Sequence, residues 1–127
     1  GFEKVADAVR HEHERWDGHG YPDGKKGEEI PLASRIVLAC DAYHAMTSHR
    51  PYRAPMTETA AREQLLRNSG SQFDPKIVDS LLTVLEERGY KAARENVRMR
   101  NLGLGGMSAP VTEEEVVTPI SRRVASA

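Results

Sequence analysis

The chain has 127 residues, of which 39% are hydrophobic and 29% charged, which suits one globular domain with a modest core. Its 18 basic and 19 acidic residues give a formal net charge of -1, too little to favour binding to nucleic acid polymers or anionic membranes. No apolar stretch approaches the roughly 20 residues that span a bilayer. The single cysteine, Cys40, cannot form an intrachain disulfide, and we expect a cytoplasmic protein.

The first predicted element is an amphipathic helix over residues 2–16. Its first apolar residues recur at helical spacing: Phe2, Val5, Ala6 and Val9. The pattern continues through His13 and Trp16, and Gly18 ends it. We therefore expect His13 and Trp16 to lie on roughly the same face as Val9.

Residues 17–31 are predicted to form a loop. They contain four glycines and two prolines, which permit positive φ angles and interrupt regular pairing. A loop of this length in so small a domain is typically either functional or disordered.

A second helix is predicted to begin at Pro31 and to cover residues 32–46. Its apolar residues form a stripe that we expect to face the core: Leu32, Ile36, Val37, Cys40, Tyr43 and Met46. The helix should then be largely buried, with Cys40 as an inert packed side chain. Pro51 interrupts the pattern, because it disfavours helical geometry at Arg50.

A third helix is predicted between residues 57 and 69. Thr57 or Thr59 can cap its N-terminus, and Ala61, Leu65 and Leu66 are expected to face inward.

The fourth helix carries the clearest signal, with Asp74 as N-cap and Pro75 in the first turn. Its apolar residues share one face: Ile77, Val78, Leu81, Leu82 and Leu85. Gly89 is expected to end the helix, although residues 90–100 can extend it as a basic helix.

The fold class predicted from these elements is all-α, a helical bundle, because no segment shows the pattern of a strand. Residues 1–100 are expected to form the folded part. Residues 101–127 begin glycine-rich and lack a sustained apolar face, so they are predicted to be a flexible tail.

Asp41 is an anomaly in the second helix, since it stands in an apolar run between Cys40 and Ala42. An unpaired buried carboxylate would cost several kcal/mol, on the order of the usual buried-charge penalty. A salt bridge to Arg35 or to another arginine is one solution. A metal ion is the other, with ligands drawn from His44 and from residues 11–13.

The candidate ligands from the first helix are His13 together with Glu12 or His11. Adjacent positions on a helix diverge by about 100°, so we expect Glu12 and His13 to serve neighbouring ions rather than one ion. Taken alone, the His-Glu-His-Glu run matches no known closed metal-site spacing.

Arg50 and Arg53 flank a rigid turn that follows the helix of Asp41. Guanidinium groups offer paired hydrogen bonds to phosphate oxygens, so the two arginines can form a phosphate clamp. The alternative is that they bond the last carbonyls of the preceding helix or pair with surface acids.

Four motifs occur in an order that closely resembles the C-terminal half of HD-GYP domains, bacterial all-helical metal-dependent phosphohydrolases that hydrolyse cyclic di-GMP. The motifs are ERWDGHGYPDG, GEEIPLASRI, DAYHAMTSHRPYR and QFDP, within residues 1–88. The resemblance implies an HD-type helical bundle.

The resemblance implies metal ligands at Glu12, His13 and Asp41. The family's paired histidines fall on Glu12 and His13, so glutamate stands here where the family has the first histidine. Two or three divalent transition-metal ions, iron or manganese, are expected in the complete domain. His11 and His19 are expected to face solvent.

The resemblance also implies substrate-binding residues. Arg50 and Arg53 match the arginines that hold the phosphates of the dinucleotide, and His44 matches a position that faces substrate. Gly20, Tyr21 and Pro22 form the GYP signature, a loop near the substrate pocket that also docks diguanylate cyclase domains.

The implied activity is hydrolysis of cyclic di-GMP to pGpG or GMP, by water activated on the metal ions, in bacterial second-messenger signalling. The chain contains no His-Asp doublet, the pair that names the family and supplies further ligands. This chain alone is therefore expected to bind metal weakly, whereas the full-length protein is expected to be an enzyme. The alternatives are a degenerate module that binds nucleotide or a cyclase without hydrolysis, and a hydrolase of another nucleotide.

Overall fold

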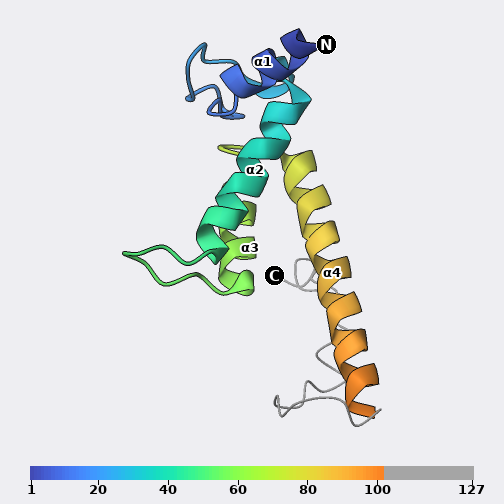
Figure 1. Cartoon of the computed structure of the whole chain (residues 1–127). Coiled ribbons are helices and arrows are strands. Elements are labelled where there is room, and N and C mark those ends of the chain that lie inside the picture. Colours follow the sequence, from blue (N-terminus) through green and yellow to red (C-terminus); the bar gives the residue numbers. More distant parts are fainter. Residues whose placement is uncertain (102–127) are drawn as a thin grey trace. The chain divides into compact units, whose positions relative to one another are not determined.

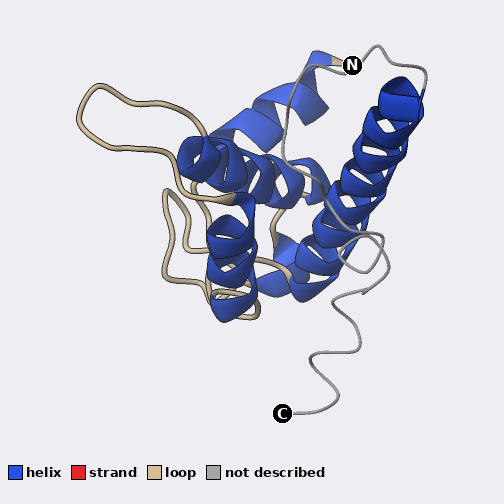
Figure 2. Ribbon diagram, turned by 90° about the horizontal axis from the view of Figure 1, so that it is seen from below, coloured by secondary structure: helices blue, strands red, loops and turns tan. Residues whose placement is uncertain are grey.

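The computed structural model describes the backbone of residues 1–101, and their side chains except at positions 90, 93, 97, 100 and 101. These residues form four α-helices and one short 3₁₀ helix (Figure 1): α1 (Phe2–Arg10), η1 (Gly27–Glu29), α2 (Leu32–Thr47), α3 (Glu58–Arg67) and α4 (Pro75–Asn101). No strand element occurs among them (Figure 2), which confirms the all-α class. The predicted tail lies, apart from residue 101, outside the described residues.

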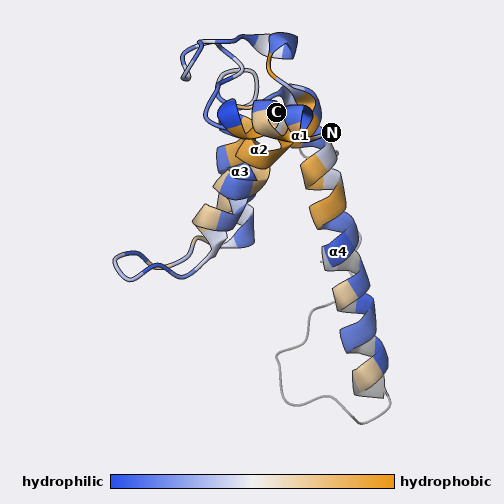
Figure 3. Cartoon of the chain, turned by 45° about the horizontal axis from the view of Figure 1, so that its top comes forward, coloured by the Kyte–Doolittle hydropathy of each residue, from blue (hydrophilic) through white to orange (hydrophobic). Residues whose placement is uncertain are grey.

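The chain divides into two compact units, residues 1–82 and residues 83–127, and the core described below belongs to the first. Four buried residues form its centre: Ala39 of α2, Leu65 of α3, Phe73 of the turn before α4, and Val78 of α4. Seven partly buried apolar residues pack against them: Leu38, Ala42, Tyr43, Met46, Ile77, Leu81 and Leu82. Figure 3 shows hydrophobic residues gathered on α2 and on the first turns of α4.

The predicted inward face of α2 is wrong for most of its members. Leu32, Ile36 and Val37 are exposed, and so is Cys40. The buried positions are instead Ser34 and Ala39, although Tyr43 and Met46 do pack against the core as predicted.

The reason for this error lies in the composition of α2, which is apolar at so many positions that no single stripe stands out. Small side chains decide the orientation, because they allow neighbouring helices to approach. Ser34 is the clearest case, since its hydroxyl donates to the carbonyl oxygen of Ala8 in α1 at 2.7 Å. The contact between α1 and α2 therefore forms around a serine that periodicity alone does not select.

Helix ends agree with the prediction at two N-termini and disagree at two C-termini. The Thr57 hydroxyl accepts from the Ala60 amide at 3.2 Å, and the Asp74 carboxylate accepts from the Lys76 amide at 2.9 Å, so both caps are confirmed. The first helix, however, ends at Arg10 rather than at Trp16. The expectation that Gly89 ends the fourth helix is wrong, whereas the alternative, an extension over residues 90–100, is confirmed, because α4 continues to Asn101.

His11 lies directly after the last residue of α1. Its side chain turns back so that Nδ1 lies 2.8 Å from the carbonyl oxygen of Asp7, one turn earlier. The same oxygen accepts the His11 amide at 3.3 Å, which is the last hydrogen bond of the helical ladder. None of residues 11–16 is helical.

Candidate metal and nucleotide site

Residues 11–31 are held against the turn that precedes α4 by backbone hydrogen bonds. The Trp16 amide donates to the carbonyl oxygen of Gln72 at 3.1 Å, and the Asp17 amide donates to that of Ser71 at 2.8 Å. The Arg35 guanidinium lies 5.8 Å from the centre of the Trp16 ring, within cation–π range. The predicted loop is confirmed, and these contacts give it a fixed attachment to the core unit.

Gly20 lies so close to the preceding chain that no larger residue fits. A Cβ atom there would come within 2.4 Å of the Arg15 amide nitrogen and 2.6 Å of the His13 carbonyl oxygen, both backbone atoms. The Tyr21 amide then donates to the same His13 oxygen at 3.3 Å. The Gly-Tyr-Pro segment is thus folded back onto residues 13–15.

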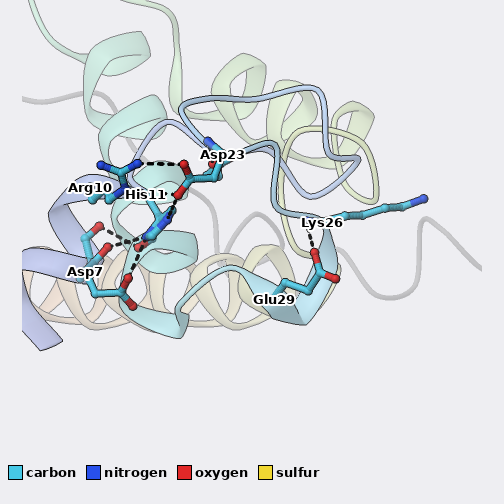
Figure 4. A network of polar contacts seen from close by, with 9 residues as sticks. Asp7, Arg10, His11, Asp23, Lys26 and Glu29 are labelled. Carbon is cyan, nitrogen blue, oxygen red and sulfur yellow. Dashed lines mark hydrogen bonds and ion pairs between the residues drawn. The ribbon is translucent and has the colours of Figure 1, made fainter.

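His11 and Asp23 form the centre of a polar network that joins α1 to this loop (Figure 4). His11 Nε2 lies 2.8 Å from Asp23 Oδ2, and Arg10 donates two hydrogen bonds to the same carboxylate, at 2.8 and 3.2 Å. His11 is buried, so its predicted exposure to solvent is wrong, whereas His19 is exposed as predicted.

The charges of the network reinforce one another. The hydrogen bond from Arg10, and next that from His11, holds the pKa of Asp23 well below its usual range. The hydrogen bond with Asp23, and next that with the Asp7 backbone, raises the pKa of His11. Because oxygen acceptors face both ring nitrogens, the surroundings favour the protonated imidazole.

Glu14 extends the network into the interior. It is buried, its Oε1 accepts from the Asp23 amide at 2.7 Å, and its Oε2 has no hydrogen-bond partner among the described residues. His11, Glu14 and Asp23 together offer ligand atoms that all lie within 4.8 Å of one another, a grouping that can hold a metal ion. The Arg10 guanidinium already supplies positive charge beside Asp23, so we interpret the group as a structural clamp.

Glu12 and His13 lie next to each other on the turn after α1. Glu12 Oε1 is 3.6 Å from His13 Nε2. Two donors bound at about 2.1 Å to one tetrahedral ion are separated by roughly 3.4 Å, so the pair can serve a single ion. The prediction that the two side chains diverge is wrong, because residues 11–13 are no longer helical.

Asp41 is exposed on α2, so the premise that it is a buried anomaly is wrong. Arg35, its expected partner in one interpretation, pairs with Asp74 instead, at 2.7 Å. Within residues 1–101, Asp41 does not join Glu12 and His13 in a three-ligand group. Its role as a metal ligand stays a prediction.

Arg50 and Arg53 lie on a turn beyond the C-terminal end of α2, paired as an isolated antiparallel bridge. Arg53 Nη2 donates to the carbonyl oxygen of Ala45 at 3.2 Å, so this arginine takes up the helix-capping role that was one of the two alternatives. The Arg50 side chain is exposed, and within the described part of the chain its guanidinium makes no hydrogen bond or ion pair. His44 is also exposed on the last turn of α2.

The two parts of the predicted site are attached to opposite ends of α2 (Figure 1). Residues 11–24 pack near its start, and the arginine turn follows its end, with Asp41 and His44 on the helix between them. A helix of 16 residues is about 24 Å long. The exposed side chains of Asp41 and His44 therefore lie along the length of helix that separates the two parts.

The fold and these residues define an all-helical domain with a set of potential metal ligands. The chain belongs to the HD domain family, whose model matches residues 2–77, and this family is metal-dependent. The resemblance drawn from the sequence motifs is thereby confirmed.

Relatives with known names support the same grouping. The chain is 40% identical over 98 residues to a probable cyclic di-GMP phosphodiesterase of Vibrio cholerae, covering 73% of this chain and 22% of that protein. It is 52% identical over 75 residues to the cyclic di-GMP phosphodiesterase response regulator RpfG of Xanthomonas campestris pv. campestris, covering 59% and 20% respectively. The chain thus spans about a fifth of the length of each of these relatives.

A solved structure shares the fold. The crystal structure of the cyclic GMP-AMP specific phosphodiesterase V-cGAP3 of V. cholerae matches with a TM-score of 0.62 and 26% identity. The match covers 96% of this chain and 30% of that one. No helix within residues 1–101 has the length and apolar character needed to cross a membrane.

Sequence reasoning missed the anchoring residues of the site. Glu14 and Asp23 look like a surface acid and a turn aspartate, and the single sequence carries no signal that distinguishes them. Glu14 binds the amide of Asp23, which is 9 residues away in the sequence, and the Asp23 carboxylate contacts the imidazole of His11, which is 12 residues away. Such contacts depend on how the loop folds back, which local patterns do not encode.

Proposed function

We propose that the protein containing this chain hydrolyses cyclic di-GMP to pGpG or GMP, in bacterial second-messenger signalling in the cytoplasm. The observation that carries this proposal is the Glu12–His13 pair, two ligand atoms 3.6 Å apart in a chain whose relatives are named cyclic di-GMP phosphodiesterases. The Arg50 guanidinium supports it, because it has no partner among the described residues and a phosphodiester is an anion.

The donor set fits a divalent transition metal. An imidazole nitrogen and a carboxylate oxygen are donor types that iron and manganese accept, and the exposed carboxylate of Asp41 is a third donor. A divalent ion, when bound, lowers the pKa of a water ligand and stabilises charge on phosphate oxygens. Glu12, His13 and Asp41 would hold the ions, with further ligands from outside the described residues.

The arginine turn contributes substrate binding in this proposal. Arg50 is the stronger candidate for the phosphate, since its five N–H donors are not engaged by the described residues. Arg53 donates one hydrogen bond to the Ala45 carbonyl oxygen, which fixes the turn. Its remaining N–H groups are left for the ligand in this proposal. His44 is exposed on the last turn of α2, and in this proposal it contacts the substrate beside them.

The test uses Asp41→Ala in the full-length protein. We expect loss of bound metal together with at least a 100-fold lower turnover of cyclic di-GMP. Glu63→Ala, which removes an exposed carboxylate of α3, is the matched control and should keep both values. Unchanged metal content and unchanged turnover in Asp41→Ala would eliminate the proposal.

A second substrate is favoured by one comparison, because the structurally similar V. cholerae protein is described as cyclic GMP-AMP specific. Competition between cyclic di-GMP and 3′3′-cyclic GMP-AMP for the purified protein separates the two. A higher kcat/KM for the mixed dinucleotide would assign the chain to that substrate.

A degenerate binding module is the remaining alternative, and Glu12 motivates it because the family resemblance expects histidine there. Such a module would bind nucleotide or a diguanylate cyclase through the exposed Gly-Tyr-Pro loop. Measurable turnover by the purified, metal-loaded protein would exclude it. If turnover is absent, recovery in Glu12→His would assign the defect to this position.

A further inference from the structure

Tyr21 and His13 are in ring contact. Their ring centres lie 5.2 Å apart, and the ring planes are inclined by 27°, a stacked arrangement. The side chain of His13 is 57% exposed and Tyr21 is 64% exposed, so neither ring is fixed by burial. An exposed imidazole on a turn can adopt several rotamers, and the tyrosine ring covers one of its faces.

The backbone of Tyr21 is fixed from both sides. On one side Gly20 lies so close to residues 13–15 that a Cβ atom on it would come within 2.4–2.6 Å of their backbone, and the Tyr21 amide donates to the His13 carbonyl oxygen. On the other side the Asp23 amide donates to buried Glu14, and the Asp23 carboxylate is held by His11 and Arg10. Each of these contacts joins residues 20–23 to residues 10–15, the segment that carries His13.

We propose that Tyr21 is a positioning residue that holds the His13 imidazole in the orientation required for binding a divalent metal. The Gly-Tyr-Pro segment then acts on the metal side of the site, in place of the substrate contact predicted for it. This inference rests on the proposed function, because it takes His13 to be a ligand.

The inference follows from what each residue of the segment does. Gly20 permits the close approach, Tyr21 supplies the ring, and Asp23 with Glu14 closes the loop behind them. Groups that orient a metal-ligating histidine typically change metal affinity by about 10- to 100-fold when they are removed. Since the contact is a ring face and involves no hydroxyl group, a phenyl ring should replace it.

The experiment measures Mn²⁺ affinity of the metal-free full-length protein by calorimetric titration. We expect Tyr21→Ala to weaken the affinity about 10-fold, Tyr21→Phe to stay within about 2-fold of wild type, and His13→Ala to weaken it at least as much as Tyr21→Ala. His19→Ala, an exposed ring on the same loop, is the matched control and should match wild type. If Tyr21→Ala does not fold, Tyr21→Leu takes its place.

A second measurement needs no metal. In the NMR spectrum of the metal-free protein, the His13 ring protons should carry a ring-current shift that is lost in Tyr21→Leu and kept in Tyr21→Phe.

Two outcomes separate this inference from the proposed function. Wild-type Mn²⁺ affinity in the Tyr21 variant together with weakened binding in His13→Ala would overturn the positioning role and leave the proposed function intact. Wild-type affinity in His13→Ala would remove His13 from the ligand set and both ideas with it. A raised KM for cyclic di-GMP with unchanged metal affinity in Tyr21→Ala would assign Tyr21 to substrate contact and also overturn the inference.

Discussion

Arg35 Nη1 lies 2.7 Å from Asp74 Oδ2, in an ion pair whose side chains are 14% and 1% exposed. The other oxygen of Asp74 caps α4 by accepting from the Lys76 amide. Arg35 also lies over the ring of Trp16. One buried carboxylate thus joins α2 to the start of α4, and its partner arginine touches the loop that carries the candidate site.

Asp74→Ala is expected to destabilise the protein by about 3 kcal/mol, because it leaves the Arg35 charge buried without its partner and removes the helix cap. Urea unfolding measures the change. Asp74→Asn keeps a capping oxygen and should lose less. Glu28→Ala breaks the exposed pair between Glu28 and Lys76 and should change stability by less than about 0.5 kcal/mol. Equal losses in the two alanine variants would contradict the assigned role of the buried pair.

Asp74 illustrates what the sequence can and cannot predict about this fold. The Asp-Pro start of α4 is a local signal, so the cap is predicted correctly. The pair with Arg35 spans 39 residues and depends on the packing of α2, whose orientation the sequence leaves undetermined. Local rules placed the helices, and contacts distant in sequence decided which faces are buried.

The candidate site shows the same division. The identities of Glu12, His13 and Asp41 come from the resemblance to a family, because the spacing of these residues alone matches no metal motif. The geometry of Glu12 and His13 differs from the expectation, because α1 ends before them and their side chains lie close together instead of diverging. At that end His11 contacts Asp7, one turn back, and Asp23, which is 12 residues away and is brought there by the fold-back of the loop.

Acid should weaken the clamp around Asp23. Its pKa is lowered in the folded protein from the ordinary 3.8, so it adds stability that is fully present above 3.8 and is lost as the pH falls toward the folded-state pKa. The difference in unfolding free energy between wild type and Asp23→Asn should therefore be largest near neutral pH and shrink below pH 3.8. Denaturant unfolding at several pH values measures it. A difference that stays constant down to pH 3 would show that the charge of Asp23 plays no part.

Gly20 and Gly89 offer opposite outcomes for the same substitution. Gly20→Ala places a methyl group against backbone atoms that cannot move aside, so we expect a loss of about 2 kcal/mol or more and weaker metal binding. Gly89→Ala lies in the interior of α4 with no atom within 4 Å, and should stabilise the helix by about 0.5–1 kcal/mol. Thermal unfolding of both variants is the measurement. A tolerated alanine at position 20 would contradict the close approach of the loop to residues 13–15.

Leu65 and Leu66 are adjacent on α3 but differ in burial, with exposed fractions of 0% and 40%. Leu65 belongs to the central cluster with Ala39, Phe73 and Val78, so Leu65→Ala removes buried methyl groups and leaves a cavity. We expect it to cost about 2–5 kcal/mol, as measured for comparable core leucines. Leu66→Ala should cost less than about 1 kcal/mol, because much of its side chain already contacts solvent. Urea midpoints of the two variants test this pairing, and a larger loss at position 66 would mean that α3 presents the opposite face to the core.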